Sequence, residues 1–167
     1  MPKFAANLTM LFTEHEFLDR FEQAAKAGFK AVEFLFPYAW TAQEIKQRLD
    51  ANGLELVLHN LPAGDWDAGE RGIACHPDRV SEFRDGVAQA IACAKVLGVG
   101  QLNCLVGKAP ADVPEDVLRK TVVENLRFAA AGYAVQQHGL EFPSVERRGD
   151  GIESVLLINI ERQLGRR

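Results

Sequence analysis

The chain has 167 residues, of which 47% are hydrophobic and 25% charged, as in an ordinary globular domain. Its 19 basic and 23 acidic side chains give a net charge of -4, which argues against nucleic acid or an anionic membrane surface as the main partner. No apolar run approaches the roughly 20 residues that span a bilayer, and the short apolar start does not resemble a signal peptide. Three cysteines without a CxxC pair argue against a disulfide framework and favour a reducing, cytoplasmic location.

Short apolar runs alternate with amphipathic stretches along residues 1–139. In chain order the expected elements are a strand at 4–8, a helix at 16–27, a strand at 31–34, a helix at 41–52, a strand at 54–58, a helix at 77–97, a strand at 101–106 and a helix at 114–137. Gly28 follows the first helix as a C-terminal glycine. Thr41 and Glu44 form a capping box ahead of the second helix, and Gly53 ends it.

This repeated order of strand and helix predicts an α/β fold with a parallel sheet and right-handed crossovers. An open doubly wound sheet and a closed (β/α)₈ barrel both begin in this way, so the order alone leaves both open. After Gly139 the pattern degrades, because Pro143 does not suit a buried strand and residues 152–164 fit a short strand or a helix equally poorly. We therefore expect two parts, residues 1–139 and an atypical tail at residues 140–167.

Polar side chains gather where each expected strand ends, and ligands of parallel α/β folds meet the carboxyl ends of the strands. The loop within LHNLPAGDWDAGERGIAC, residues 58–75, carries most of them. The candidates for binding a small polar ligand are Asn7, Glu33, Tyr38, His59, Asn60, Asp65, Glu70, Arg71, Asn103 and Lys108.

These side chains also have structural alternatives, which are a turn cap for Asn7, a surface charge for Glu33, a satisfied buried histidine for His59 and a solvated loop lysine for Lys108. Asp65 and Glu70 could instead hold their loop together through Arg71. Cys93 and Cys104 fall in helix and strand patterns and are expected to be small core residues.

Nucleotide sites are excluded by spacing. GVGQLNCLVGK does not match the GxxxxGK[ST] phosphate loop, since Ala109 stands where Ser or Thr is needed. The only GxG precedes a strand, whereas a dinucleotide fingerprint follows one. The sequence also lacks HExxH, an Asp-rich loop and any Cys/His spacing typical of a metal site.

Several segments nevertheless match a known family. They are FAANLTMLFTE, AGFKAVEFLFPY, LHNLPAGDWDAGERGIAC, EFRDGVAQAI, LNCLVGK and VVENLRFAA. Through them the chain resembles the hydroxypyruvate isomerases, a group of xylose-isomerase-like (β/α)₈ TIM barrels. The 2-oxo-tetronate isomerases share the FLFPY segment and a similar loop, but LHNLPAGDW and NCLVGK are closer to the hydroxypyruvate enzymes.

The resemblance implies a partial (β/α)₈ barrel of four to five units, because a complete barrel typically takes about 250 residues. It implies an aldose–ketose type isomerisation between hydroxypyruvate and tartronate semialdehyde through an enediolate, with a divalent metal, Mg²⁺ or Mn²⁺. Such barrels use two glutamates as acid and base. Glu146 is the best candidate for the first catalytic glutamate and for a metal ligand, and Glu141 is a weaker one. The substrate contacts that we expect are Asn7, His59, Asn60, Glu70, Arg71, Asn103 and Lys108.

The second glutamate and strands six to eight have no counterpart in the sequence. We therefore expect a tail produced by a frameshift or a truncation, and weak or absent activity. The alternative is a non-catalytic half barrel that binds a small hydroxy or oxo acid or pairs with another chain to complete a barrel. Exposed sheet edges also make a homo-oligomer an expected partner state. A further alternative is a different isomerase on the same scaffold, such as one acting on 2-oxo-tetronate.

Overall fold

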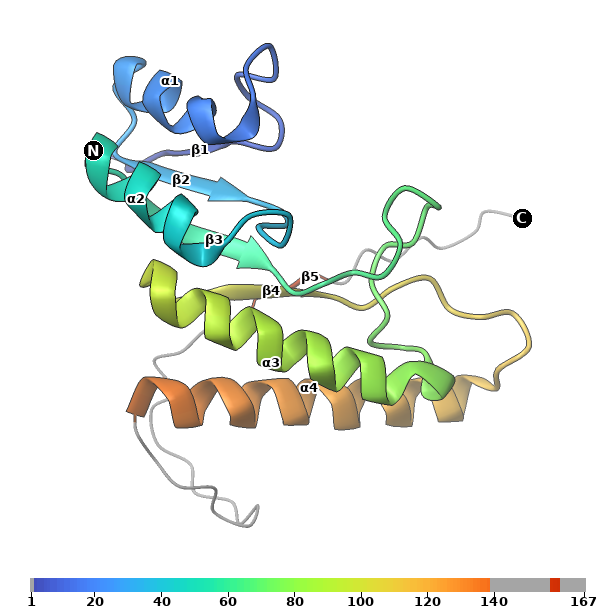
Figure 1. Cartoon of the computed structure of the whole chain (residues 1–167). Helices are drawn as coiled ribbons and strands as arrows, with labels where there is room; N and C mark the ends of the chain where they lie inside the picture. Colours follow the sequence, from blue (N-terminus) through green and yellow to red (C-terminus); the bar gives the residue numbers. More distant parts are fainter. Residues whose placement is uncertain (1, 139–156, 160–167) are drawn as a thin grey trace. The chain divides into compact units, whose positions relative to one another are not determined.

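The computed structural model describes residues 2–138 and 157–159 (Figure 1). Two compact units make up the chain. The first unit consists of Met1–Asn60 and Gln89–Leu102, and the second of Leu61–Ala88 and Asn103–Arg167.

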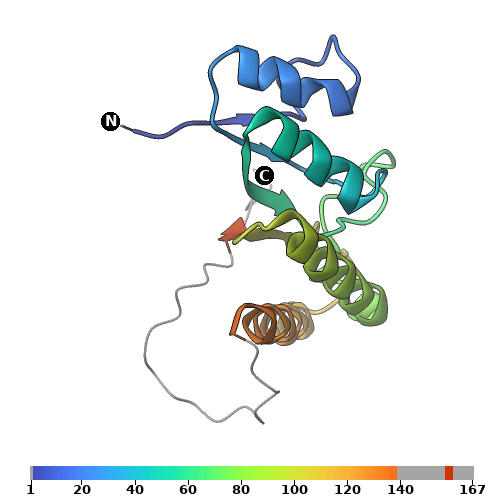
Figure 2. The same ribbon diagram turned by 60° about the vertical axis from the view of Figure 1, so that its left-hand side comes forward.

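The first unit contains three parallel strands in the order β1 (Ala5–Asn7), β2 (Ala31–Phe34) and β3 (Glu55–Asn60). Between the strands lie the 3₁₀ turn η1 (Phe17–Asp19), helix α1 (Arg20–Lys26) and helix α2 (Ala42–Asn52). Figure 2 shows α1 and α2 on the same side of these strands. The connections are therefore β–α–β crossovers of the kind that the sequence predicts.

An aromatic cluster joins the strands to their helices. The ring of Phe34 on β2 lies 5.4 Å from the ring of Phe17 and 5.9 Å from that of Phe21 on α1. Trp40 stacks on Phe17 at 4.2 Å. Because side chains alternate along a strand, Val32 and Phe34 face the helices, whereas Glu33 faces the other side of the sheet.

Helix α2 begins and ends as the sequence predicts. The Thr41 hydroxyl accepts a hydrogen bond from the backbone N–H of Glu44, and the Glu44 carboxylate accepts one from the backbone N–H of Thr41. Gly53 follows in the left-handed conformation, with φ 59°, which glycine adopts without steric penalty.

A β-bulge alters the register between β2 and β3. Val32 lies beside Leu56, but the next residue, Glu33, lies beside Leu58. Phe34 is consequently paired with His59. A one-residue shift moves all following side chains to the opposite face, so the bulge turns His59 toward the helices.

The second unit begins with the loop at 61–76, followed by the 3₁₀ turn η2 (Pro77–Arg79). Helix α3 (Val80–Leu97) starts in this unit and ends in the first. Strand β4 (Leu102–Leu105) is followed by helix α4 (Glu115–His138), and β4 pairs in parallel with β5 (Leu157–Asn159). The buried Asn125 of α4 donates from Nδ2 to the carbonyl oxygen of Ala74 at 3.0 Å, which ties α4 to the loop.

The predicted alternation is confirmed, because every expected strand and helix is present with ends that differ by a few residues. Strand β5 falls within residues 152–164, for which the sequence allowed either a short strand or a helix. Glu141, Glu146 and the expected boundary after residue 139 lie outside the described residues. None of the helices that the structure describes is long and apolar enough to cross a membrane.

Candidate functional site

Asn7 and Glu33 lie side by side at the carboxyl ends of β1 and β2. Asn7 donates from Nδ2 to a carboxylate oxygen of Glu33 at 3.0 Å, and both side chains are half-buried. They occupy the face of the sheet opposite to the one covered by Phe17 and Phe21. The structure thus brings together two of the residues that the sequence predicts at this edge.

His59 lies on the other face. Its side chain is completely buried, and its ring lies 6.2 Å from the ring of Tyr38. His59 Nδ1 is 3.1 Å from the carbonyl oxygen of Asn60, which also accepts a hydrogen bond from the Tyr38 hydroxyl at 2.5 Å. Since a carbonyl can only accept, Nδ1 carries the proton and Nε2 is a bare acceptor. That a substrate contacts His59 stays a prediction.

Burial determines the ionisation of this pair. It lowers the pKa of His59 to about 4, partly opposed by the hydrogen bond to Asn60, so the imidazole is neutral near pH 7. Burial also raises the pKa of Tyr38, whose hydroxyl remains a donor. No partner for His59 Nε2 exists among the described residues. The pair therefore supplies no charge and fixes the Asn60 carbonyl.

The loop at 61–76 lies against the end of β4 through two glycines. Gly72 forms an antiparallel bridge with Val106, and a Cβ built on Gly72 would lie 2.1 Å from the carbonyl oxygen of Leu105. A Cβ on Gly107 would likewise lie 2.3 Å from the carbonyl oxygen of Gly72. Only glycine permits this approach, because real Cβ contacts are never so short.

Arg71 is held in a fixed orientation within that loop. Its guanidinium carbon lies 3.9 Å above the centre of the Trp66 ring, a cation–π geometry. Nη1 donates to the carbonyl oxygens of Trp66 at 2.9 Å and Glu70 at 2.6 Å. Among the described residues Nε and Nη2 donate to no acceptor, so the edge of the guanidinium that suits a carboxylate is available.

Glu70 shapes the same loop. One of its carboxylate oxygens accepts from the backbone N–H of Asp65 at 2.5 Å, and the other forms an ion pair with Arg79. Both interactions lower the pKa of Glu70, the Arg79 hydrogen bond most. The structure corrects the alternative in which Arg71 is the cation that holds this carboxylate, because that cation is Arg79.

Lys108 and Asn103 complete the predicted set in the second unit. The exposed Lys108 donates from Nζ to the carbonyl oxygen of Gly69 at 2.8 Å. Asn103 is buried in β4, and its backbone carbonyl accepts from the N–H of Leu61 at 2.8 Å. Cys75 is also buried there, and burial raises the pKa of its thiol. A thiol with a raised pKa is a poor nucleophile near pH 7.

The described residues do not fit a divalent metal. No group of three or more His, Cys, Asp or Glu side chains lies close enough within them to hold one. Glu33 is hydrogen-bonded to Asn7, and Glu70 is paired with Arg79. The prediction of a metal at Glu146 concerns a residue outside the described part of the chain.

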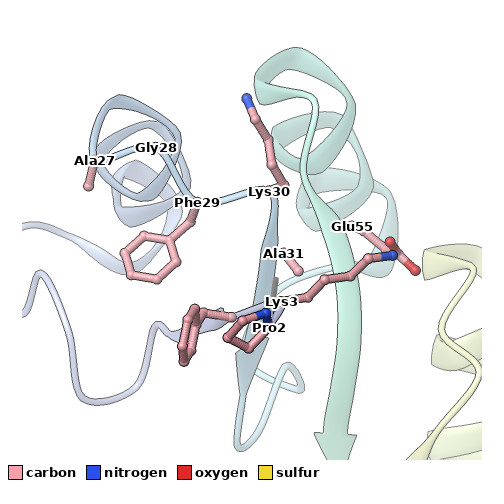
Figure 3. A pocket seen from close by; sticks show the side chains of 9 residues that line it. Pro2, Lys3, Ala27, Gly28, Phe29, Lys30, Ala31 and Glu55 are labelled. Atoms are coloured by element: carbon pink, nitrogen blue, oxygen red, sulfur yellow. The ribbon is translucent and has the colours of Figure 1, made fainter.

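A hollow of about 490 Å³ lies at the other end of the first unit's strands (Figure 3). Lys3, Phe29, Lys30 and Glu55 are among the residues that line it, from the amino ends of the strands and the turn before β2. Ligands of parallel α/β folds bind at the carboxyl ends. Within the first unit, the hollow is therefore separate from Asn7 and Glu33, which lie at the carboxyl ends of β1 and β2.

Sequence reasoning missed two contributors to the loop. Trp66 supplies the platform for Arg71, and Arg79 supplies the charge that holds Glu70. The GDWDAGERG segment contains the Trp–Arg pair, so that contact could have been proposed from their spacing. Nothing in the sequence indicates the ion pair between Glu70 in the loop and Arg79 in η2, which lie nine positions apart.

Residues 21–142 match the family model described as xylose isomerase-like TIM barrel. The chain is 59% identical over 130 residues to hydroxypyruvate isomerase of Escherichia coli (strain K12). The matched residues make up 78% of this chain and 50% of that protein. It is 51% identical over 136 residues to 2-oxo-tetronate isomerase of Cupriavidus necator, covering 81% of this chain and 52% of that protein.

A solved structure shows the same fold. It is described as an AP endonuclease, family 2, from Brucella melitensis, and superposes with a TM-score of 0.78 at 44% identity, covering 84% of this chain and 53% of that one. The likeness favours the barrel over the open doubly wound sheet that the order of elements had left possible. The chain spans about half the length of the curated relatives it matches.

Proposed function

Because the chain belongs to the xylose isomerase-like TIM barrel family, we propose that it is an isomerase that interconverts hydroxypyruvate and tartronate semialdehyde. The observation that carries this proposal is the 59% identity to hydroxypyruvate isomerase over 78% of the chain. That matched length includes strand ends and the glycine-rich loop, whose side chains suit a small, polar, anionic substrate.

The proposed reaction moves one proton between neighbouring carbons. Removal of a proton from the hydroxymethyl carbon of hydroxypyruvate gives an enediolate, and a proton added to the adjacent carbon gives the aldehyde. The hydroxyl proton passes from one oxygen to the other, so the two acids are isomers. Glu146 remains the predicted base, and it lies outside the described residues.

Arg71 is the proposed anchor for the substrate carboxylate. Its Nη1 is occupied by two backbone carbonyls and its face by Trp66, which leaves the Nε–Nη2 edge for two parallel hydrogen bonds. Lys108 adds a second cation in the same unit. Asn103 of this unit is proposed to contact an oxygen of the substrate, and Glu70 to keep the shape of the loop around Arg71. That Asn7 and Asn60 of the first unit contact a substrate stays a prediction from the sequence.

The test is an assay of the purified full chain with hydroxypyruvate, with and without Mg²⁺ or Mn²⁺, in which NMR follows the aldehyde product. Arg71→Gln should raise KM or the dissociation constant by about tenfold or more, since a charge-assisted hydrogen bond typically contributes that much. Arg84→Gln is the matched control, because the Arg84 guanidinium also lies over an aromatic ring, 4.9 Å from that of Phe128. If the unaltered chain neither converts nor binds hydroxypyruvate, the proposal is contradicted.

A second candidate is isomerisation of 2-oxo-tetronate, favoured by the 51% identity to an enzyme of that name. The two acids share the carboxylate and carbonyl and differ in the length of the hydroxylated end. Running both substrates at equal concentration in the same assay separates the candidates, because the natural substrate should have the higher kcat/KM.

A further inference from the structure

We propose that Glu33, held in place by Asn7, recognises the substrate by accepting a hydrogen bond from one of its hydroxyl groups. This inference rests on the proposed function, and it assigns to one carboxylate of the first unit the selection of hydroxylated acids.

The Glu33 side chain lies on the face of the strands that the helices do not cover. Its two neighbours in β2, Val32 and Phe34, are 0% and 2% exposed, and Phe34 contacts rings of η1 and α1. Glu33 therefore points the opposite way, and it stays half-buried. It also lies at the carboxyl end of β2, where parallel α/β folds bind their ligands.

The Asn7 amide can have only one orientation. Its Oδ1 accepts a hydrogen bond from the backbone N–H of Thr9 at 3.0 Å, so its Nδ2 is directed at Glu33, also at 3.0 Å. The Thr9 hydroxyl in turn accepts from the backbone N–H of Leu35 at 2.9 Å. These bonds link the ends of β1 and β2, and they fix the carboxylate before any ligand arrives.

Within residues 2–138 and 157–159, no Lys, Arg or His side chain forms an ion pair with the Glu33 carboxylate. Among the residues that the structure describes, Asn7 is the side-chain partner of Glu33, and it occupies one of the two carboxylate oxygens. Glu70 differs, because Arg79 neutralises it. A half-buried carboxylate with a vacant acceptor oxygen is suited to a hydroxyl donor, and such a bond is short and charge-assisted. A substrate carboxylate would instead be repelled, so Glu33 selects the hydroxyl end of the molecule.

The test compares hydroxypyruvate with pyruvate, which has the same carboxylate and carbonyl but lacks the hydroxyl. Dissociation constants of both acids are measured by NMR titration or calorimetry on the full chain, on Glu33→Gln and on Asn7→Ala. Glu55→Gln is the control, because Glu55 is an exposed carboxylate at the opposite end of the strands. We expect the unaltered chain and Glu55→Gln to prefer hydroxypyruvate by about tenfold or more.

In Glu33→Gln that preference should fall to about threefold or less while the affinity for pyruvate is unchanged, and Asn7→Ala should give an intermediate preference. Retention of the full preference in Glu33→Gln, or an equal loss of both affinities, would overturn the inference. If the unaltered chain isomerises hydroxypyruvate but binds both acids equally, the inference fails and the proposed function stands. If the unaltered chain neither binds nor converts hydroxypyruvate, the proposed function is wrong, and the inference, which rests on it, is wrong as well.

Discussion

The first unit and the loop at 61–76 of the second unit keep their shapes by different means. In the first unit, aromatic rings on β2, η1 and α1 pack at 5.4–5.9 Å, and the sheet follows the regular alternation of side chains. In the loop, the shape depends on a cation over an indole, an ion pair and glycines that approach carbonyl oxygens. One region should therefore be sensitive to lost volume, and the other to the addition of a single methyl group.

The strongest test of this contrast is Phe34→Ala. The side chain is 2% exposed and contacts two rings, so its removal leaves a cavity and should lower the free energy of unfolding by about 3–5 kcal/mol. Urea denaturation measures the change. Phe4→Ala is the control, because Phe4 is 72% exposed and should change stability by less than about 0.5 kcal/mol. Equal losses in the two variants would show that the cluster does not hold the unit together.

Lowering the pH should destabilise the first unit at His59. Its pKa is about 4 in the folded chain and about 6.5 when unfolded, so the unfolded state binds more protons between these values. The neutral, buried His59 therefore contributes to the free energy of unfolding a pH-dependent part of about 3 kcal/mol. This part is fully present above pH 6.5 and is lost as the pH falls toward 4. His59→Gln should flatten the decline of unfolding free energy over this range. An unchanged slope in the variant would refute a neutral, desolvated His59.

Gly72→Ala tests the loop directly. The added Cβ would lie 2.1 Å from the Leu105 carbonyl oxygen in a backbone with φ +113°, so we expect a loss of at least about 2 kcal/mol. Gly100→Ala is the matched control, since a Cβ there meets nothing within 4 Å. Thermal and urea unfolding measure both variants. A Gly72→Ala chain as stable as the control would mean that the loop can move away from β4 without penalty.

The smallest effect is expected at the start of α2. Thr41→Ala removes the hydroxyl half of the capping box and should destabilise the chain by about 1 kcal/mol. Gln43→Ala, two positions along the same helix, serves as the control. Circular dichroism during urea denaturation measures both, and indistinguishable midpoints would argue against a stabilising cap.

The elements of the fold could be predicted because their causes are local. Apolar periodicity predicted the strands and helices, and the Thr41–Glu44 box with Gly53 predicted both ends of α2 almost to the residue. The placement of Asn7 and Glu33 at one edge of the sheet also followed from a simple rule, because parallel strands bring their carboxyl ends to one edge. The hydrogen bond between the two side chains was not predicted.

The orientations and partners of the candidate site residues could not be predicted in the same way, because they depend on contacts between residues that no local sequence pattern indicates. The bulge in β3, where Val57 has no paired residue on β2, turns His59 toward the helices. Without it the alternation would have placed that side chain on the face of Glu33. The close approach of Gly72 to Gly107, and the choice of Arg79 rather than Arg71 as the partner of Glu70, arise only when the loop meets β4 and η2. Such non-local contacts decide which predicted polar residues remain available to a ligand.

The placement of the two tryptophans has a practical consequence for spectroscopy. Trp40 stacks on Phe17 in the first unit, while Trp66 lies beneath the guanidinium of Arg71 in the second. Each region therefore carries its own intrinsic fluorophore. Replacing either indole with phenylalanine leaves an emission signal that reports on one region alone, so unfolding of the aromatic cluster and anion binding near Arg71 can be followed separately without any attached dye.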